Sequence, residues 1–565
     1  MTRRTTRSLR WLVPVALVSS LVGVAPDLSA HAAAAPLSAV RGPQVQEHSS
    51  KAVAFDVTQP LRHMAGGVAA PSGPAEVSPD RGDIPAASAF TADRGLQSAA
   101  LSEAAPLTTQ ANFEGLANSE NTVAGLRQVS PPDPVGDVGP TQYVEMVNLV
   151  FAVYDKSGTR LLGPTPLGAL WAGFAVNDCT DNSGDPIVRH DQLADRWIMT
   201  QFTTRGPTFF NCIAVSETAD ATGPYFRYAF STGTNFPDYP KYGVWPNAYF
   251  IATREFQGLS GPFVGIGAYA LERERMLDGD PDARVVSFLR TPADTPLAVL
   301  GDGWLPSDLD GQVLPPDGSP NVFVGTMNVA AGRGAPFDGL NIFEFSIEWN
   351  DTPTASFGLT AQLEVEDFNS LFPCSPGPRN CIPQPATTNK IDVLSFRQRP
   401  TWRLAYRNFG SFESLVTNQS VQAQPGIAGV RWYEIRRVGG RYSVHQQATF
   451  SPEDGVNRWM GSAAMDRRGD IALGYSVSNA TDVFPGIRFT ARLSSDPVDE
   501  MTLGEGVVIN GSGSQLGPSP RWGDYTSLNI DPTDDCTFWY VNEYYAVSSA
   551  RGWQTRIASF RLPGC

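Results

Sequence analysis

The chain has 565 residues, of which 42% are hydrophobic and 10% aromatic, so a chain that is disordered throughout is excluded. Its 57 acidic and 42 basic side chains leave a formal net charge of −15, which argues against a nucleic-acid partner. The 53 glycines and 46 prolines predict many turns.

The first 32 residues have the pattern of a secretory signal peptide. Four arginines precede an apolar run at residues 11–24, and small residues follow at Ala30 and Ala32. The run is shorter than the ~20 residues of a membrane-spanning helix and contains Pro14, which favours cleavage over anchoring. Twin-arginine export is the alternative route, but the apolar residues expected after an arginine pair are missing. Cleavage near Ala32 predicts a secreted, extracellular protein with a net charge of −18.

The composition and hydrophobic pattern of the chain change twice after the signal peptide. Residues 33–112 are rich in Ala, Ser, Pro and Gly without sustained periodicity, and we expect a flexible linker or pro-segment there. From Phe113 onward, short alternating runs of Val, Ile, Tyr, Phe and Trp are separated by turn residues, which predicts an all-β domain over 113–565. No later apolar stretch reaches spanning length, so we expect no membrane insertion after signal cleavage. We also expect a monomer.

One local phrase occurs seven times in residues 113–565: a polar turn leads into a strand opened by an aromatic or β-branched residue. Each unit would be a small antiparallel sheet that cannot cover both of its faces alone, and stacking around an axis is the simplest way to bury them. The sequence therefore predicts a β-propeller, with seven blades favoured over six; a pair of β-sandwiches is the alternative. The phrases are DVGPTQYVEMVNLVFAVYD, RHDQLADRWIMTQF, VWPNAYFIATREF, SPNVFVGTMNV, RNFGSFESLVTNQSV, MDRRGDIALGYSVS and DPTDDCTFWYVNEYY.

All six cysteines follow the signal peptide. An even number in an exported chain favours disulfides, and no C-x-x-C occurs that would indicate zinc, so we expect no metal-binding cysteines. Fifteen pairings are formally open. Pairing of sequence neighbours is the simplest, and its last bridge would fasten the C-terminal edge of the final blade. The three expected bridges are Cys179–Cys212, Cys374–Cys381 and Cys536–Cys565.

The segment MDRRGDIALGYS, residues 465–476, resembles the Asp-box of sialidase-like propellers, in which a turn aspartate caps the adjoining backbone. Asp466 and Gly469 match that motif, but Leu473-Gly474-Tyr475 replaces its usual final tryptophan. Phrases such as DPIVRHDQLADRWIMTQF and RWGDYTSLNIDPTDDCTFWYVNEYY are also similar to those of a family of exported bacterial β-propeller proteins, over residues 113–565. The resemblance implies a fold and a location and little about chemistry.

Four arginines precede or enter aromatic strands, where loops of successive blades would converge on the axis. They are Arg189, Arg458, Arg488 and Arg521. Guanidinium groups bind carboxylates in a bidentate manner, so a converging set predicts a clamp for an acidic sugar or another anionic ligand. The alternative is that each arginine fixes a blade junction by bonding backbone carbonyls.

Cleavage of a glycan needs two carboxyl groups across a cleft, or a tyrosine that a carboxylate activates. The catalytic candidates are Asp524, Tyr525 and Glu543, with Asp191 as a further polar contact and Trp522 and Tyr544 as stacking surfaces. Strand alternation over 537–545 predicts Trp539, Val541, Glu543 and Tyr545 on one face and Phe538, Tyr540, Asn542 and Tyr544 on the other. Both faces are bulky, as a strand packed between neighbouring sheets requires.

Other chemistry has weaker signals. Only His190 and His445 lie in the β region, and no nucleophile, zinc or phosphate motif is present, so we expect no required cofactor. Closely spaced oxygens at 178–185 leave a Ca²⁺ loop open, but the closing glutamate of an EF-hand is missing and an ordinary acidic turn is the simpler interpretation. The oxygen-bearing residues are Asp178, Asp181, Asn182 and Asp185.

Two functions fit this sequence. The first is a secreted propeller that binds, and as a glycoside hydrolase or polysaccharide lyase cleaves, an extracellular glycan, with acidic polysaccharides favoured by the arginines. The second is a non-catalytic adhesion or scaffold module that presents loops to a protein or cell-envelope partner, favoured by the missing catalytic signature and by the tether at 33–112.

Overall fold

The computed structural model describes residues 47–64, 92–97, 107–371, 379–393, 397–517 and 520–565. The signal peptide predicted for 1–32 lies outside the described residues. Strand accounts for 51% and helix for 6%, which confirms the all-β class. In the described ranges, no helix combines the length and apolar character needed to cross a bilayer.

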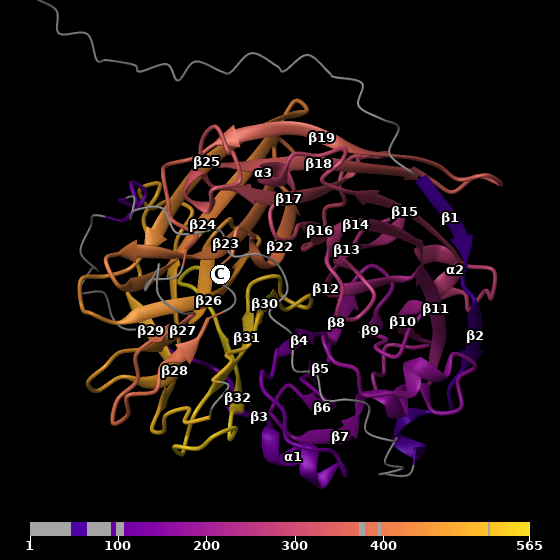
Figure 1. The fold of residues 1–565 in the computed structure, drawn as a ribbon, viewed down its shortest axis with the longest axis horizontal. Helices are drawn as coiled ribbons and strands as arrows, with labels where there is room; N and C mark the ends of the chain where they lie inside the picture. Colours follow the sequence, from indigo (N-terminus) through magenta and orange to yellow (C-terminus); the bar gives the residue numbers. More distant parts are fainter. Residues whose placement is uncertain (1–46, 65–91, 98–106, 372–378, 394–396, 518–519) are drawn as a thin grey trace, which may run out of the picture. The chain divides into compact units, whose positions relative to one another are not determined.

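Seven four-stranded groups, called sheets 1 to 7 in chain order, carry nearly all of the strands (Figure 1). Sheet 1 holds β4 (Val135–Val138), β5 (Gln142–Met146), β6 (Val150–Asp155) and β7 (Arg160–Pro166). Sheet 2 holds β8 (Ile187–Asp191), β9 (Arg196–Phe202), β10 (Phe209–Ser216) and β11 (Tyr225–Gly233). Sheet 3 holds β12 (Asn235–Val244), β13 (Ala248–Gln257), β14 (Phe263–Glu272) and β15 (Arg284–Arg290). Sheet 4 holds β16 (Leu305–Leu309), β17 (Asn321–Met327), β18 (Gly339–Glu348) and β19 (Thr354–Glu364).

The remaining sheets follow the same antiparallel order, and a parallel pairing of β16 with β22 joins sheets 4 and 5. Sheet 5 holds β22 (Thr401–Asn408), β23 (Glu413–Gln424), β24 (Ile427–Val438) and β25 (Arg441–Phe450). Sheet 6 holds β26 (Asn457–Met465), β27 (Ile471–Ser478), β28 (Phe484–Arg492) and β29 (Glu505–Gly511). Sheet 7 holds β30 (Ser527–Ile530), β31 (Phe538–Tyr544), β32 (Gln554–Phe560) and, from the other end of the chain, β3 (Asn112–Ala117).

Short elements connect these sheets. The helices are α1 (Asn118–Val123), α2 (Arg273–Leu277), α3 (Leu297–Leu300) and the 3₁₀ turns η1 (Leu61–His63), η2 (Leu167–Trp171), η3 (Asn177–Thr180) and η4 (Val329–Ala331). A separate two-stranded sheet pairs β20 (Asn380–Ile382) with β21 (Ile391–Asp392).

The first strand of each sheet lies innermost, and these seven strands form an unbroken circle. Each contacts the next in chain order, and β30 of sheet 7 returns to β4 of sheet 1 (Figure 1). Each of the seven sequence phrases includes the turn or strand start at which the chain enters the second strand of one sheet. The repeated phrase therefore marks the unit of the structure.

The part of the chain predicted as a flexible linker contributes strands to this ring. β1 (Glu47–Lys51) pairs with β15 at the outer edge of sheet 3, and β2 (Ala54–Val57) pairs with β11 at the outer edge of sheet 2. For these residues the linker prediction was wrong, because the exposed edge of a sheet offers unpaired N–H and C=O groups to any nearby segment. Residues 33–46, 65–91 and 98–106 lie outside the described residues.

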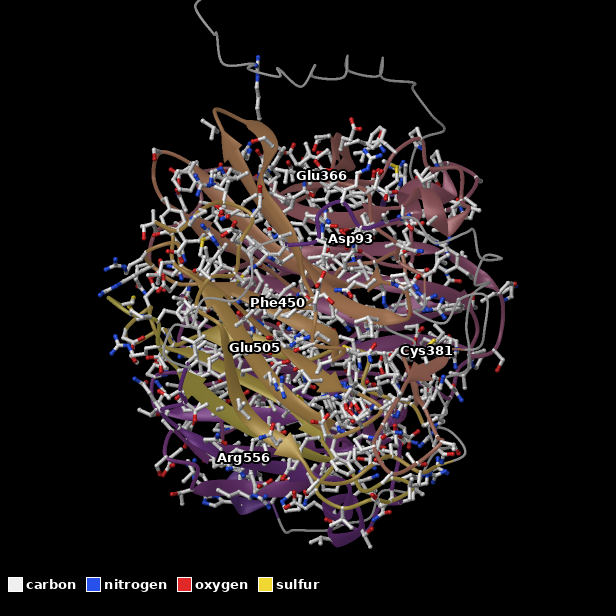
Figure 2. All side chains as sticks on the ribbon, turned by 90° about the vertical axis from the view of Figure 1, so that its left-hand side faces the viewer. Asp93, Glu366, Cys381, Phe450, Glu505 and Arg556 are labelled. Atoms are coloured by element: carbon white, nitrogen blue, oxygen red, sulfur yellow. A yellow bond between two sulfur atoms is a disulfide. The ribbon has the colours of Figure 1, made fainter. Side chains whose placement is uncertain are left out.

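Residues 92–97 are a second ordered piece of the predicted linker. Asp93, labelled in Figure 2, bonds Arg431 Nη1 at 3.0 Å, and both side chains are fully buried. Its other oxygen accepts the hydroxyl of Thr449 at 2.6 Å. Because a buried guanidinium without its carboxylate is costly, this contact holds the segment firmly against sheet 5.

Aromatic side chains fill the space between neighbouring sheets. Phe250 of sheet 3 lies edge-on to Phe323 and Phe345 of sheet 4, with ring centroids 6.0 and 5.1 Å apart. The alternation predicted along β31 is confirmed: Trp539 and Val541 belong to the core shared with sheet 1, whereas Phe538 and Tyr540 belong to the core shared with sheet 6. A strand with two bulky faces is thus a strand between two sheets.

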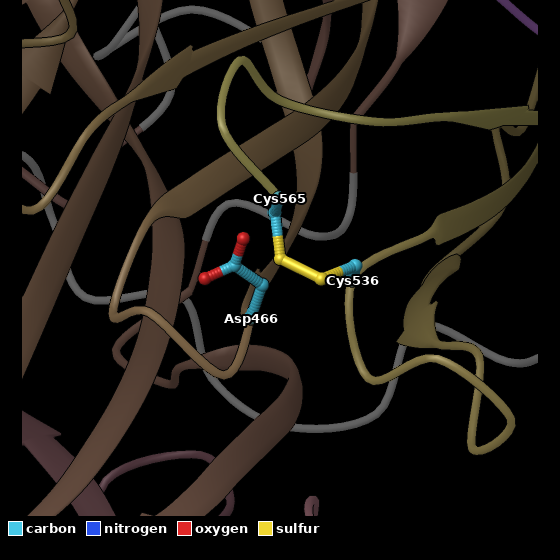
Figure 3. Close-up of side chains that lie close together, drawn as sticks. All are labelled: Asp466, Cys536 and Cys565. Atoms are coloured by element: carbon cyan, nitrogen blue, oxygen red, sulfur yellow. A yellow bond between two sulfur atoms is a disulfide. The ribbon is translucent and has the colours of Figure 1, made fainter.

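The expected disulfides Cys179–Cys212 and Cys536–Cys565 are present. The third expected pair includes Cys374, which lies outside the described residues, whereas Cys381 is disulfide-bonded. Figure 3 shows Asp466 beside the Cys536–Cys565 bridge, which ties the last residue to the turn before β31. The carboxylate of Asp466 accepts the N–H groups of Arg468 and Asp470, which is the capping role that the Asp-box resemblance implies.

A buried ion network crosses the axis of the ring. Asp308 on β16 accepts hydrogen bonds from Arg189 Nη2 at 2.6 Å, Arg403 Nε at 2.8 Å and the Val244 N–H at 3.0 Å. Arg189 also bonds Asp137 on β4 and Asn529 on β30, both at 2.7 Å. Side chains of five inner strands and the backbone of a sixth therefore meet in one connected set.

We predict that Arg403→Met destabilises the protein by roughly 3–5 kcal/mol, because the buried carboxylates of Asp308 and Asp310 lose the guanidinium group that neutralises them. Urea unfolding measures the change. Arg62→Gln, which removes an exposed pair with Asp220, is the control and should cost about 1 kcal/mol or less. Equal losses for the two variants would contradict the structural weight given to the network.

Glu145 predicts a pH dependence of stability. It is buried beneath β3, where its carboxyl group accepts the Leu116 N–H at 2.8 Å and the Thr555 hydroxyl, and burial raises its pKa to about 7. Since the pKa is higher in the folded state, its contribution is complete below the unfolded value of 4.5 and is lost as pH rises through 7. The stability of the wild type relative to Glu145→Gln should fall by about 3 kcal/mol across that window in urea unfolding.

The control for this experiment is Glu114→Gln, which alters an exposed carboxylate on the same strand, β3. The difference between wild type and the control should be nearly constant with pH. A Glu145→Gln difference that is equally flat would show that this carboxyl group does not titrate as described.

Candidate functional site

Charged and aromatic side chains gather at the end of the ring where the inner strands begin. They come from the segments that enter β4, β8, β16, β22 and β30, from β12, β13 and β31 themselves, and from the loop after η4. We call this set the mouth cluster. Its members are Asp133, Asp185, Asp238, Tyr239, Lys241, Arg254, Asp302, Arg333, Arg397, Arg399, Arg521, Asp524, Tyr525 and Glu543. The most exposed of these side chains, that of Arg333, is 13% exposed.

Three consecutive inner strands carry strained backbone, immediately before β4 and β8 and at the irregularity within β12. Asp133, Asp185 and Tyr239 have φ angles of 47°, 42° and 54°, in the left-handed region that non-glycine residues rarely adopt. Each directly precedes a proline, whose ring disfavours helical backbone at the preceding position. Such strain costs of order 1–3 kcal/mol per residue and persists where the surroundings impose it, most often at functional sites.

Lys241 lies at the centre of the cluster. Its Nζ lies 3.5 Å from the ring centroid of Tyr239 and 3.8 Å from that of Tyr525, and it donates a hydrogen bond to the Pro240 carbonyl at 3.0 Å. Burial lowers the pKa of this amine to about 7, although Asp185 opposes the change. The register of β12 against β13 breaks between Asp238 and Lys241, and this irregularity directs the lysine inward.

Four carboxyl groups lie on the side of the cluster formed by sheets 7, 1 and 2. Asp133 accepts the Asp524 N–H at 2.6 Å, and burial, with the charge of Asp524, raises the pKa of Asp133 to about 7. Burial likewise raises the pKa of Asp185 and of Glu543 well above the ordinary range. Three of the four carboxyl groups are thus held toward their protonated form.

Asp524 behaves in the opposite way. Burial alone would raise its pKa, but the guanidinium groups of Arg521 and Arg399 hold the pKa below its ordinary value. Arg521 Nη2 bonds Asp524 Oδ1 at 2.7 Å, and Arg399 Nη2 lies 3.9 Å from Oδ2. An ionised carboxylate beside protonated ones is the arrangement that acid–base catalysis uses.

The predicted site residues separate into three places. Arg521, Asp524, Tyr525 and Glu543 belong to the mouth cluster, whereas Arg189 lies below it in the axial network. Asp191 lies at the far end of β8, where it accepts Arg273 Nε at 2.7 Å and the Tyr249 hydroxyl at 2.8 Å. The prediction that Asp191 joins this site was therefore wrong, because strand β8 carries it to the opposite edge.

The expected arginine clamp does not form. Arg458 bonds Asp454 at 2.6 Å and Glu505 at 2.8 Å, and Arg488 lies 3.3 Å from Glu505, all within sheet 6. Glu505, labelled in Figure 2, therefore neutralises both guanidinium groups away from the mouth cluster. The four arginines were predicted to converge, but each is paired with a carboxylate that its own surroundings supply.

The expected stacking surfaces are also buried. Trp522 is 1% exposed, donates to Ser476 Oγ at 3.0 Å and packs against Trp459. Tyr544 is 3% exposed and donates to Glu114 Oε2 at 2.9 Å. Both rings serve packing between sheets and offer no face to a sugar.

The acidic residues considered for a Ca²⁺ site lie in two different places. Arg205 Nη2 bonds Asp181 at 2.5 Å and Nη1 lies 3.7 Å from Asp178, whereas Asp185 belongs to the mouth cluster. Among the described residues, the carboxylates of Asp178, Asp181 and Asp185 do not form a group whose oxygens all lie within 4.8 Å of one another.

Sequence reasoning missed several members of the cluster that share a recognisable pattern. A charged residue followed by proline stands immediately before an inner strand in Asp133-Pro134, Asp185-Pro186 and Arg399-Pro400. The repeated phrase drew attention to the turns at the opposite end of each inner strand. The sequence pattern that marks the site, a charged residue followed by proline, stands before the inner strand and not after it.

A concavity of 1280 Å³ lies at the opposite strand ends of sheets 3 and 4. Its lining includes Trp349, Arg273 and Arg284. Arg273 bonds Asp191, and Arg284 bonds Glu272 at 2.6 Å and lies 5.4 Å from the Trp349 ring. The guanidinium groups of Arg273 and Arg284 are thus paired within the wall of this concavity.

No family model and no curated protein matches the chain. An endo-arabinase from Bacteroides thetaiotaomicron is 12% identical, covering 54% of this chain and 92% of its own, with a TM-score of 0.26. The phage phi92 endosialidase is 8% identical, covering 77% of this chain and 68% of its own, with a TM-score of 0.32. Likeness at this level assigns neither activity nor substrate to this chain.

Asp133 gives a direct check on the electrostatics of the mouth cluster. Because burial raises its pKa to about 7, this carboxyl group should be largely protonated below pH 7 and ionised above it. Infrared difference spectra should therefore show one protonated buried carboxyl group in wild type below pH 7 that is absent from Asp133→Asn. Identical spectra for the two proteins below pH 7 would contradict this assignment.

Proposed function

We propose that this protein is an exported, seven-bladed β-propeller whose mouth cluster binds an extracellular glycan and hydrolyses it. The unbroken circle of seven inner strands supports the propeller and its blade number. The predicted signal peptide and the two disulfides support the extracellular location.

The observation that carries the proposal is that carboxyl groups of one cluster have unlike partners: Asp524 is bonded by Arg521 at 2.7 Å, whereas Asp133 and Asp185 lie buried at neighbouring strand starts. Burial raises the pKa of Asp185 well above its ordinary range, whereas nearby guanidinium groups hold the pKa of Asp524 below its ordinary value despite burial. Both residues lie at the end of the ring where the inner strands begin. Hydrolysis of a glycosidic bond requires a protonated carboxyl group to donate to the leaving oxygen and an ionised one on the other side of the sugar. We assign Asp185 the role of acid and Asp524 that of base or nucleophile.

The cluster favours this function over adhesion. An adhesion surface does not need strained backbone in three neighbouring inner strands and the turns before them, nor buried carboxyl groups whose protonation states differ. Asp133 positions Asp524 by accepting its backbone N–H at 2.6 Å. Lys241 supplies a cation whose charge changes near neutral pH.

The test is a screen of purified protein against sialylated, uronic and neutral polysaccharides, with release of reducing ends as the readout. Asp185→Asn and Asp524→Asn should each lower kcat by at least about 100-fold, because each removes one half of the acid–base pair, while glycan binding persists. Asparagine tolerates left-handed backbone, so Asp185→Asn should fold normally.

Asp466→Asn is the matched control, because Asp466 is also fully buried with its pKa raised by burial, to about 6, yet it lies in the β26–β27 turn. It should retain turnover. Binding without turnover by the wild type, or equal loss of rate in all three variants, would contradict the proposed hydrolysis.

A further inference from the structure

The mouth cluster is electrically divided. Its carboxyl-rich half comes from sheets 7, 1 and 2, as described above. The other half comes from sheets 3, 4 and 5 and holds four guanidinium groups around two carboxylates. Those residues are Arg254, Arg333, Arg397, Arg399, Asp238 and Asp302.

Asp302 is the centre of the arginine half. Both of its oxygens lie 3.0 Å from Arg333 Nη2, and Arg254 and Arg397 approach it at 3.7 and 3.8 Å. Burial opposes ionisation, but these guanidinium groups hold the pKa of Asp302 at about 2. One carboxylate thus faces three cations, and Asp238, 3.4 Å from Arg254, is the second acidic group on this side.

Arg399 connects the two halves. Its guanidinium lies 3.7 Å from the ring centroid of Tyr239, on the same tyrosine that Lys241 contacts. The residue is 3% exposed, and its Nη2 has no hydrogen-bond partner among the described residues; Asp524 Oδ2 is 3.9 Å away. A buried charged donor without an acceptor is costly, so this group is suited to an incoming anion.

Building on the proposed function, we propose that the glycan carries an acidic substituent, a carboxylate or a sulfate ester, which binds the arginine half through Arg399 and Arg397. The neighbouring glycosidic bond then lies over Asp185 and Asp524. The excess of guanidinium groups over carboxylates on one side fixes the direction in which the sugar enters. Tyr239, held between Arg399 and Lys241, separates the binding half from the reacting half.

The division also explains how a strongly acidic chain accepts an anionic ligand. The protein carries a formal charge of −15, which repels polyanions at a distance. At the mouth, however, five guanidinium groups face six carboxyl groups, of which Asp133, Asp185 and Glu543 are held toward their neutral form. Local charge is therefore positive where the chain as a whole is negative.

The experiment compares three oligosaccharides of equal length in isothermal titration calorimetry: a uronic acid oligomer, a sulfated galactan oligomer and a neutral galactan oligomer. At least one acidic oligomer should bind roughly 10- to 100-fold more tightly than the neutral one, the range expected for charge-assisted hydrogen bonds. The two acidic arms distinguish carboxylate from sulfate. Arg399→Gln should remove the preference, and Arg399→Lys should restore part of it.

Arg437→Gln is the matched control, since Arg437 is also paired with a carboxylate but lies in β24, remote from the site, and it should keep the full preference. Should Arg399→Gln not fold, the wild type suffices: affinity for the acidic oligomer should fall steeply with added salt, and affinity for the neutral one should not.

The outcomes separate this inference from the function on which it rests. Turnover of neutral glycan with no preference for the acidic oligomers would overturn the inference and leave the proposed hydrolysis standing. A preference that survives in Arg399→Gln would place the anion elsewhere and would also overturn it. Absence of binding by all three oligomers and of turnover on the polysaccharide panel would remove both.

Discussion

Asp308 is the group on which the architecture depends most directly. It accepts hydrogen bonds from three different inner strands, and it is completely buried together with Arg403. Sheets packed through apolar faces alone could slide against one another, because hydrophobic contact has no direction. The fixed geometry of guanidinium and carboxylate sets the relative height of the inner strands, and thereby the positions of the residues that precede them.

The alignment of the inner strands brings the residues of the mouth cluster together. Asp133, Asp185 and Asp524 each stand two or three positions before the strand that follows, so strands held at equal height bring them together from distant parts of the sequence. The strained backbone at Asp133 and Asp185 is then a consequence of turning a loop inward immediately before a proline. The apolar cores of the seven sheets supply the stability that tolerates this cost.

The repeated unit, the bulky two-sided strand and two of the disulfides could be predicted because each rests on local pattern. The composition of β31 alone requires neighbours on both faces, and the structure provides them. The fate of the four arginines could not be predicted, since a guanidinium near an aromatic strand looks the same whether its partner is a ligand or Glu505. Pairing across sheets depends on register, which sequence spacing does not reveal.

The linker prediction failed for a related reason. Low hydrophobicity indicates that a segment cannot form its own core, but β1 and β2 need none, because they complete ladders that other strands have begun. Lys241 was overlooked because a single lysine in NFPDYPKYG has no distinguishing neighbour; the aromatic ring that covers its second side, Tyr525, lies far along the sequence.

The pairing of β3 with β32 has a consequence for how the molecule comes into being. Asn112 on β3, the outer strand of sheet 7, bonds Arg556 on β32 across 444 positions, so β3 has no partner strand until β32 has been synthesised. A polypeptide that lacks β32 leaves β3 without its neighbour and exposes the edge of β31 in sheet 7. Assembly of this protein is consequently an event of its last residues.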